Sequence, residues 1–407
     1  MPRKCTSRLR GIFMDWQSWI VETAAAPTHI TDKLIQAASF CYHYNMPGVV
    51  ALRLPRELAI VYRQRDDLIF HPDFRLKPCA STTSLGPTFF TQFMKRSGIA
   101  AQGLNDVLKL IGAPDAWLRS TGAETYIAIV DSGINKSHLE FPAWKRADGF
   151  SFDGSDPWQD SLGHGTMCAA IAAGSPQAGA RVSGVAPNAR LYSCRINYTA
   201  SEAIAAYEWI ENRFKEHGKP IIVNNSFGFE SKMPPVELGI PITPNHLMAR
   251  VLRRMVTNGL PVVFAAGNNH NGAACVNPLP CSPDTIWAFP SLPEIMTVAD
   301  IDQKLDPREF SSRGPGQWHT NTSQKPDCAA PTFGYVLFGD TYREADDGWG
   351  TSGAAPQVTG LLSLLASQRP AATPTELNDR VRSTCKPLNA CRRCVGHGMI
   401  QCNMALW

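Results

Sequence analysis

Three stretches of this 407-residue chain carry side chains that could together perform acyl transfer. Asp131 ends the apolar run Tyr126–Val130, His164 stands between two glycines, and Ser352 stands in Gly350-Thr351-Ser352-Gly353-Ala354-Ala355-Pro356. A serine hydroxyl is a poor nucleophile unless an adjacent base takes its proton. A histidine can serve as that base while a carboxylate orients its imidazole. The three residues are therefore candidates for a nucleophilic triad.

The first two of these residues are expected at the ends of regular elements. The β-branched run Tyr126–Val130 predicts a buried parallel strand with Asp131 at its carboxyl edge, where α/β sheets place their ligands. The small residues Met167–Gly174 predict a helix directly after His164. A packed or capping histidine is the alternative for His164 taken alone.

Ser352 is expected at or just before the first turn of a buried helix, because apolar residues follow it from Val358 to Leu365 at helical spacing. Unpaired N–H groups at a helix N-terminus favour the oxyanion that attack on a carbonyl creates. Pro356 is expected in the first turn, where its missing N–H costs nothing. An ordinary helix cap is the alternative for Ser352 alone.

Taken together, the motifs Ala128–Gly133, Gly163–Thr166 and Gly350–Pro356 resemble the three active-site signatures of the subtilisin-like serine proteases. Further stretches over about residues 105–405 resemble the same family, namely Gly184–Pro187, Asn225–Gly228, Ala265–Asn268, Ser311–Pro315 and Lys325–Pro331. The resemblance implies a serine endopeptidase of narrow specificity that cleaves a protein or peptide substrate through an acyl-enzyme. A maturation protease or transpeptidase that passes the acyl group to an amine is an alternative. A non-catalytic binding module on the same fold is another.

The resemblance also implies roles for residues around the triad. The side-chain amide of Asn268 and the backbone N–H of Ser352 would hold the oxyanion. Substrate contacts are expected from Ser226, Phe227, Gly228, Ala266 and Gly267.

Four features depart from the family pattern or extend it. Gly353 replaces a usual methionine and is expected to loosen packing beneath the nucleophile, and Phe229 is expected to narrow or re-aim the specificity pocket. The short segment 197–202 is expected to weaken strand pairing with substrate. Asp160 either shapes the loop before His164 or favours a basic substrate residue, and a solvated carboxylate is the alternative.

Alternating strand and helix patterns predict an α/β fold, with a subtilisin-like parallel sheet covered by helices on both faces. Helices are expected at Ala203–Lys215 and Leu247–Asn258. We assign residues 99–407 to this peptidase domain. Residues 1–98 are assigned to a small N-terminal α+β domain, with helical spacing over Trp16–Ala38, a strand at Val49–Leu54 and a helix at Arg56–Leu68.

Two roles are open for the N-terminal domain. It is either a propeptide-like domain that inhibits the enzyme in cis or an accessory domain that recruits a partner or substrate. Residues 81–87 are small and turn-forming and predict a linker. If the domain is a propeptide, the cleaved bond is expected between Pro78 and Gly103.

The spacing of four C-terminal cysteines is compatible with one metal site. Cys385, Cys391, Cys394 and Cys402 could hold a structural zinc ion with four thiolates, and ordinary cysteines or one disulfide are the alternative. No other cofactor is expected. Residues 175–180 lack the set of carboxylates and amides that a strong calcium site needs, since they offer one amide, Gln177, and no carboxylate.

The remaining composition is that of a globular protein, with 44% hydrophobic and 18% charged residues and a net charge of +4. The sequence has no block of lysine and arginine, so neither a nucleic acid nor an anionic membrane is expected as a partner. No run approaches the roughly 18 apolar residues of a membrane span. Asp15 interrupts the stretch after the basic N-terminus, so no signal peptide is expected. A cytoplasmic location is the expectation, with unconventional secretion as the alternative.

Overall fold

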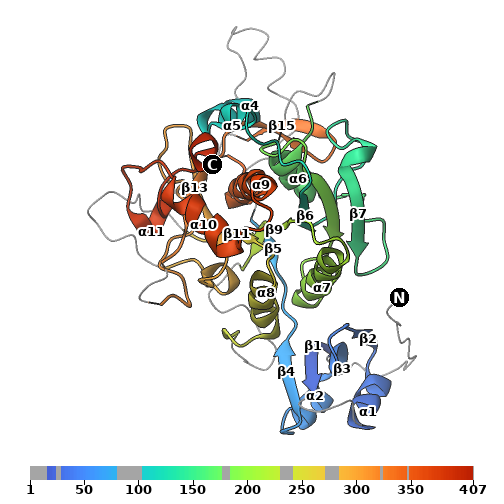
Figure 1. The fold of residues 1–407 in the computed structure, drawn as a ribbon. Helices are drawn as coiled ribbons and strands as arrows, with labels where there is room; N and C mark the ends of the chain where they lie inside the picture. Colours follow the sequence, from blue (N-terminus) through green and yellow to red (C-terminus); the bar gives the residue numbers. More distant parts are fainter. Residues whose placement is uncertain are drawn as a thin grey trace.

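A computed structural model of the chain describes residues 16–23, 29–79, 103–176, 184–229, 242–270, 284–320, 324–345 and 348–406. A large α/β body and a smaller N-terminal unit lie one beside the other (Figure 1). Within the described ranges, none of the helices combines the length and apolar character needed to cross a bilayer.

The body is built on a seven-stranded sheet in which every pair of neighbouring strands is parallel. In spatial order its strands are β13 (Cys328–Pro331), β12 (Met296–Ile301), β11 (Val262–Ala265), β9 (Ile221–Asn225), β6 (Tyr126–Asp131), β8 (Arg190–Arg195) and β7 (Arg146–Ser151). β6 is the fifth of the seven strands, with neighbours on both sides, and it places Asp131 in the interior of the carboxyl edge. The predicted parallel sheet is confirmed.

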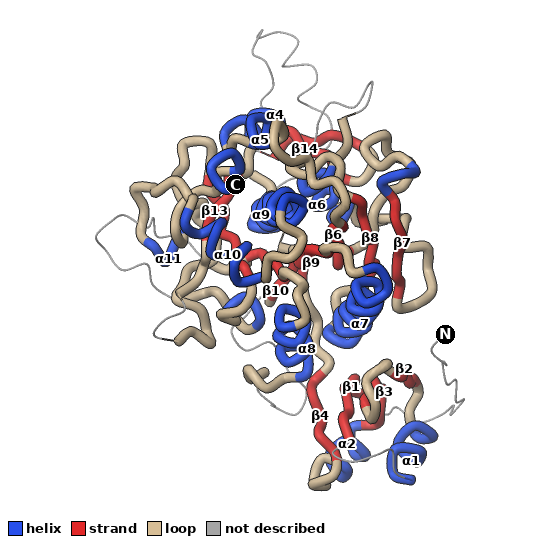
Figure 2. The backbone as a smooth tube through the Cα atoms, in the orientation of Figure 1, coloured by secondary structure: helices blue, strands red, loops and turns tan. Residues whose placement is uncertain are grey.

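Helices cover both faces of this sheet (Figure 2). One face packs against α6 (His164–Ala173) and α9 (Thr351–Gln368), with α4 (Leu104–Leu110), α5 (Ala113–Ala116), α10 (Pro374–Ser383) and α12 (Cys402–Ala405) around them. The opposite face packs against α7 (Ala200–His217) and α8 (Leu247–Thr257). Smaller elements are α11 (Arg392–Val395), the 3-10 turns η1 (Ala143–Lys145) and η3 (Phe289–Ser291), and the antiparallel hairpin β14 (Gly334–Phe338) and β15 (Thr341–Ala345).

Burial on both faces explains the continuous apolar character of β6. Ile127 and Ile129 belong to the core shared with α6 and α9, whereas Ala128 and Val130 belong to the core shared with α7 and α8. A strand in such a position has no solvent-facing side, so its residues do not alternate between apolar and polar.

The N-terminal unit is a four-stranded antiparallel sheet in the order β2 (Phe40–His43), β3 (Val49–Pro55), β1 (Trp16–Thr23) and β4 (Leu68–Pro72), with α1 (His29–Ala37) and α2 (Arg56–Tyr62). The prediction of helix over Trp16–Ala38 is wrong for the first half of that segment, which forms strand β1. Strand β1 lies in the interior of the sheet and is covered on both sides, with Trp19 and Val21 facing the small core and Ile20 facing the large domain. Two-sided burial again removes the alternation that identifies a strand.

Candidate active site

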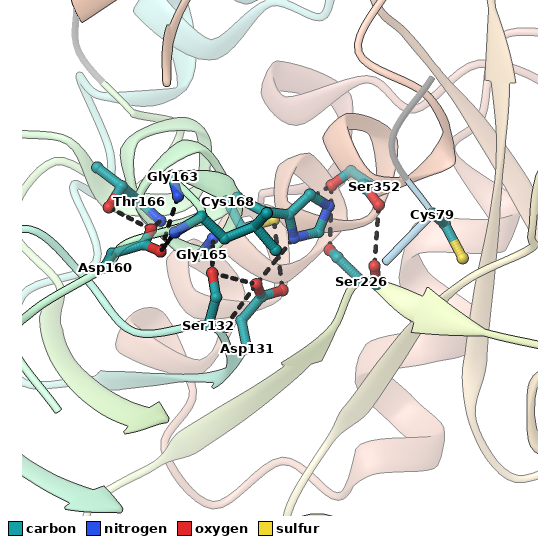
Figure 3. A network of polar contacts seen from close by, with 12 residues as sticks. Cys79, Asp131, Ser132, Asp160, Gly163, Gly165, Thr166, Cys168, Ser226 and Ser352 are labelled. Carbon is teal, nitrogen blue, oxygen red and sulfur yellow. Dashed lines mark hydrogen bonds and ion pairs between the residues drawn. The ribbon is translucent and has the colours of Figure 1, made fainter. Parts of the chain in front are cut away.

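The three candidate catalytic residues come from three elements that meet at the carboxyl edge of the sheet (Figure 3). Asp131 is the last residue of β6, His164 the first of α6 and Ser352 the second of α9. His164 Nδ1 lies 2.8 Å from Asp131 Oδ1, and all three side chains are buried. The structure therefore brings together a nucleophile, a base and a carboxylate that orients the base.

Asp131 is held by several donors on the same oxygen that binds the histidine. Its Oδ1 accepts hydrogen bonds from Ser132 N at 2.8 Å, from Ser132 Oγ at 3.2 Å and from the Tyr198 hydroxyl at 2.7 Å. Burial and the nearby Asp131 carboxylate raise the pKa of Tyr198 well above its ordinary value, so the phenol keeps the proton that it donates. Sequence reasoning did not find Tyr198, because it lies 67 residues from Asp131 and outside any motif.

The helix that carries His164 is positioned by Asp160. Asp160 Oδ1 accepts from the backbone N–H of Gly163 at 2.8 Å, and Oδ2 accepts from the N–H and hydroxyl of Thr166 at 2.9 and 2.6 Å. These bonds satisfy backbone donors that a helix start leaves unpaired. Of the alternatives for Asp160, the geometry supports the one in which it shapes this loop.

The serine hydroxyl is directed toward a different acceptor from the histidine. Ser352 Oγ donates to the carbonyl of Ser226 at 2.9 Å. Within the part of the chain that the structure describes, His164 Nε2 has no hydrogen-bond partner although it is buried. His164 Nε2 is the atom that must accept the serine proton, and it is therefore unoccupied among the described residues. A rotation of the Ser352 side chain would direct its hydroxyl away from the Ser226 carbonyl.

Pro356 lies one turn further into α9 than predicted, as its sixth residue. Because proline has no N–H, the carbonyl of Ser352 loses its usual partner four residues later. That carbonyl instead accepts from Ser226 Oγ at 3.0 Å and lies 3.6 Å from Cys168 Sγ. The proline thus frees a backbone acceptor that ties the nucleophile to the neighbouring strand.

The predicted oxyanion donors converge on a carbonyl oxygen of this chain. Asn268 Nδ2 donates to the backbone oxygen of Cys79 at 2.6 Å, and the N–H of Ser352 donates to the same oxygen at 3.2 Å. Thr351 donates through its N–H and hydroxyl to Asn268 Oδ1 at 3.1 and 2.9 Å, which orients the amide. Two donors directed at one carbonyl oxygen are what stabilisation of a tetrahedral oxyanion requires.

Cys79 is the last described residue of an extended segment that lies between two edges of the peptidase domain. On one side β5 (Lys77–Pro78) pairs antiparallel with β10 (Phe227–Gly228), and Cys79 N donates to Ser226 O at 3.0 Å. On the other side Leu76 N donates to Tyr198 O at 2.6 Å, and Arg75 bridges Thr199. The shortened segment 197–202 therefore keeps an edge for strand pairing, contrary to expectation.

The other predicted substrate contacts have distinct positions. Ser226, Phe227 and Gly228 line the segment directly. Ala266 and Gly267 support Asn268 from the adjoining strand end, where Ala266 N donates to Val298 O and Gly267 N to Thr351 Oγ1 at 3.2 Å. Gly267 has a φ of 103°, a conformation that favours glycine.

Gly353 does not loosen the packing beneath Ser352, because Trp349 occupies the available space. A Cβ atom on Gly353 would lie 2.6 Å from the Cβ of Trp349 and 3.1 Å from its ring. The expectation of looser packing was wrong, since it considered the missing methionine without the tryptophan that precedes it.

The four C-terminal cysteines do not gather into one site. The sulfurs of Cys391 and Cys394 lie 2.8 Å apart, Cys385 Sγ contacts the carbonyl of Val381, and Cys402 is buried in the core around α9. Among the residues that the structure describes, the one group of three His, Cys, Asp or Glu side chains with ligand atoms within 4.8 Å is Asp131, His164 and Cys168. The geometry gives a four-thiolate zinc site no support.

Comparisons with known proteins agree with this geometry. A model of the subtilase family matches residues 122–398. Subtilisin E of Bacillus subtilis is 30% identical over 269 residues, 65% of this chain and 61% of that protein. Mycosin-1 of Mycobacterium tuberculosis is 29% identical over 334 residues, 73% of this chain and 71% of that protein. The chain thus spans about three fifths of the length of the first of these relatives.

A solved structure shares the fold. The crystal structure of MycP1 with the N-terminal propeptide removed superposes with a TM-score of 0.58 at 23% identity, covering 74% of this chain and 96% of that chain. The family model covers well over half of the chain and includes Asp131, His164 and Ser352. The chain is a member of the subtilase family.

Proposed function

We propose that this protein is a serine endopeptidase that cleaves protein or peptide substrates. One observation carries the proposal: the carbonyl oxygen of Cys79 lies between Asn268 Nδ2 and the N–H of Ser352. Cys79 belongs to the extended segment that lies between β10 and residues 198–199, and we call the space between these two edges the cleft. A peptide carbonyl held in this way is placed beside the nucleophile. The subtilase relatives support the same activity.

The chemistry follows from the groups at this site. Ser352 attacks the substrate carbonyl as His164 takes its proton at Nε2, and Asp131 stabilises the resulting imidazolium through Nδ1–H. The tetrahedral oxyanion receives hydrogen bonds from Asn268 and from the Ser352 N–H. Collapse expels the amine, which takes the proton from His164, and water then hydrolyses the acyl-enzyme by the same steps.

We also propose that residues 1–79 act as a propeptide that inhibits in cis and is cut between Cys79 and Ala80. The bond lies within the range predicted from the sequence. The side chain of Cys79 is a neutral thiol, because burial and the nearby Asp131 raise its pKa to about 12, and a Cβ on Gly228 would lie 3.4 Å from its sulfur. A small, uncharged side chain thus lies beside Gly228, next to the proposed cleaved bond. MycP1, the structural relative, has an N-terminal propeptide.

The N-terminal unit is docked by hydrogen bonds to the start and the middle of α7 as well as by the segment that ends the described part of the unit, residues 75–79. Asp73 accepts from the N–H and hydroxyl of Ser201 at 2.9 and 2.7 Å, and the backbone N–H groups of Asn45 and Met46 each donate to Glu208 at 3.0 Å. These contacts hold the domain in a position that keeps residues 75–79 in the cleft. An inhibitory role is favoured over recruitment of a partner by this arrangement.

The test is the mass and N-terminal sequence of the purified chain after incubation. We expect a new N-terminus at Ala80 and a fragment that ends at Cys79. A chain that stays whole but cuts an added peptide would retain the endopeptidase and reject the propeptide, whereas loss of both reactions would reject the proposed function. Added hydroxylamine or an amino-acid amide distinguishes transpeptidation, because the fragment then carries the mass of the amine.

Two buried histidines face each other where the N-terminal unit meets α8. His71 in β4 and His246 at the start of α8 have ring centroids 5.2 Å apart. His246 Nε2 bonds the carbonyl of Pro72 at 3.1 Å, and its Nδ1 accepts from the N–H of Met248 at 3.1 Å. Because Nδ1 is an acceptor here, His246 must be neutral in the docked state.

Burial gives both histidines a low affinity for protons. Burial is the main cause that lowers the pKa of His246 to about 3, and the nearby His71 lowers it further. Burial is also the main cause that lowers the pKa of His71. The nearby Arg250 lowers the pKa of both histidines. Glu22, which accepts hydrogen bonds from Arg250 and His71, instead raises the pKa of His71. Both groups bind protons better once separated, near the ordinary histidine pKa of about 6.5.

Acidification is therefore expected to release the cleaved N-terminal domain. Docking is fully favourable above about pH 6.5 and weakens as the pH falls below it, because proton uptake stabilises the separated state. Gel filtration of the processed chain should show co-elution of the two fragments at about pH 7.5 and separation at about pH 5. A His71→Gln chain serves as the comparison and should separate less sharply; equal retention of the wild-type fragments at both pH values would contradict the prediction.

A further inference from the structure

An aromatic side chain of the N-terminal segment is enclosed by three rings of the peptidase domain. The ring centroid of Phe74 lies 5.0 Å from that of Phe229, 5.1 Å from that of His246 and 5.7 Å from that of Phe289. Phe74 is 5% exposed, and the three surrounding side chains are buried. These separations are those of favourable aromatic contacts.

The three rings come from separate parts of the peptidase domain. Phe229 follows β10, His246 begins α8, and Phe289 begins η3, where Trp318 packs against it at 5.6 Å. Each ring also contacts another of the three, since Phe289 lies 5.8 Å from Phe229 and 5.9 Å from His246. The enclosure is thus formed by the peptidase domain, and the N-terminal segment supplies its occupant.

The enclosure lies in register with the catalytic centre. Phe74 is five residues before Cys79, on the extended segment that pairs with both edges of the cleft. Its own carbonyl accepts from the N–H of Ala200 at 3.1 Å. Strand pairing fixes the position of each side chain along the cleft. A substrate bound with the same pairing would place its sixth residue before the cleaved bond in this enclosure.

We propose that Phe229, His246 and Phe289 form a specificity subsite that selects protein substrates with an aromatic residue at the sixth position before the cleaved bond. The inference rests on the proposed endopeptidase function. It extends substrate recognition well beyond the residues next to the cut and gives Phe229 a role, because its ring packs against Phe74.

The chemistry of the enclosure favours an uncharged ring over other side chains. Its three walls are flat rings, two of them apolar, and His246 is neutral while its Nδ1 accepts from the N–H of Met248. A charged side chain would be buried there without an opposite charge, which is costly. A smaller aliphatic side chain would bury less apolar area and lose the ring contacts.

The experiment compares peptides cut by the processed peptidase domain, after its N-terminal fragment has been separated at about pH 5 and the enzyme returned to about pH 7.5. The reference peptide has the sequence of residues 73–81, with a donor and a quencher at its ends, and the test peptide carries Phe74→Ala. We expect kcat/KM to fall about 10- to 100-fold for the alanine peptide, the range given by burial of one phenylalanine side chain. A Phe74→Tyr peptide should keep most of the reference value.

A peptide with the sequence of residues 76–81 and a Phe229→Leu enzyme complete the design. The short peptide does not reach the subsite, so its cleavage reports the catalytic reaction alone. We expect the preference of the Phe229→Leu enzyme for the Phe74 peptide over the alanine peptide to shrink toward one. Cleavage of all peptides at equal kcat/KM would overturn the subsite, whereas failure to cut even the short peptide would reject the endopeptidase function.

Discussion

Replacing Ser352 by alanine is expected to lower peptide hydrolysis by a factor of about 10⁴–10⁶. The variant retains Asn268 and the backbone N–H of residue 352, which bind the carbonyl oxygen, but has no atom that can form the acyl-enzyme. It should also stay whole at the bond between Cys79 and Ala80, so the N-terminal segment remains in the cleft. Single-turnover assays on a quenched peptide and intact-mass measurement would give the two results.

Ser367→Ala is the matched control for this substitution. Ser367 lies in the same helix and donates to the carbonyl of Ala123 at 2.7 Å at the protein surface. The control should process itself and cut the peptide at nearly the parent rate, since it changes no group at the active site. Processing of the Ser352→Ala chain at the parent rate would show that another nucleophile or a contaminating protease cuts the bond.

Replacing Asp131 by asparagine is expected to lower kcat by about 10⁴. Asp131 Oδ1 accepts from His164, Ser132 and Tyr198, and the carboxylate stabilises the imidazolium that forms when Ser352 loses its proton. An amide lacks that charge, and its NH₂ group can hold the wrong tautomer of His164, with the proton on Nε2. A base in that form cannot accept the serine proton.

The loss should appear in kcat far more than in KM, because Asp131 acts on the charged transition state and does not contact the substrate segment. Asp148→Asn in β7 is a suitable control, since Asp148 lies at the surface beside Arg213. Thermal unfolding of both variants checks the fold. A variant Asp131→Asn that keeps the parent kcat would exclude Asp131 from the mechanism.

The catalytic residues were predictable because each lies within a short, local pattern. A β-branched run ending in Asp131, a glycine-flanked His164 and a glycine-flanked Ser352 are all visible over a few neighbouring residues. The sheet of parallel strands was predictable for the same reason, since strand and helix patterns alternate along the chain. The N-terminal strand β1 was not, because burial on both faces removes the period that distinguishes a strand from a helix.

By itself, the sequence identified the family fold and the candidate triad and oxyanion residues, since the motifs that carry them consist of residue types at short range. Only the tertiary structure decided that Tyr198 binds Asp131, that Trp349 fills the space at Gly353, and that the Cys79 carbonyl binds the side-chain amide of Asn268. Tyr198 and Asp131, and likewise Cys79 and Asn268, are far apart in the sequence and meet only after folding. Trp349 is close to Gly353 in the sequence, but the turn before α9 decides that its side chain fills this space. Contacts of this kind depend on where strands and loops meet in space, and no local spacing encodes them.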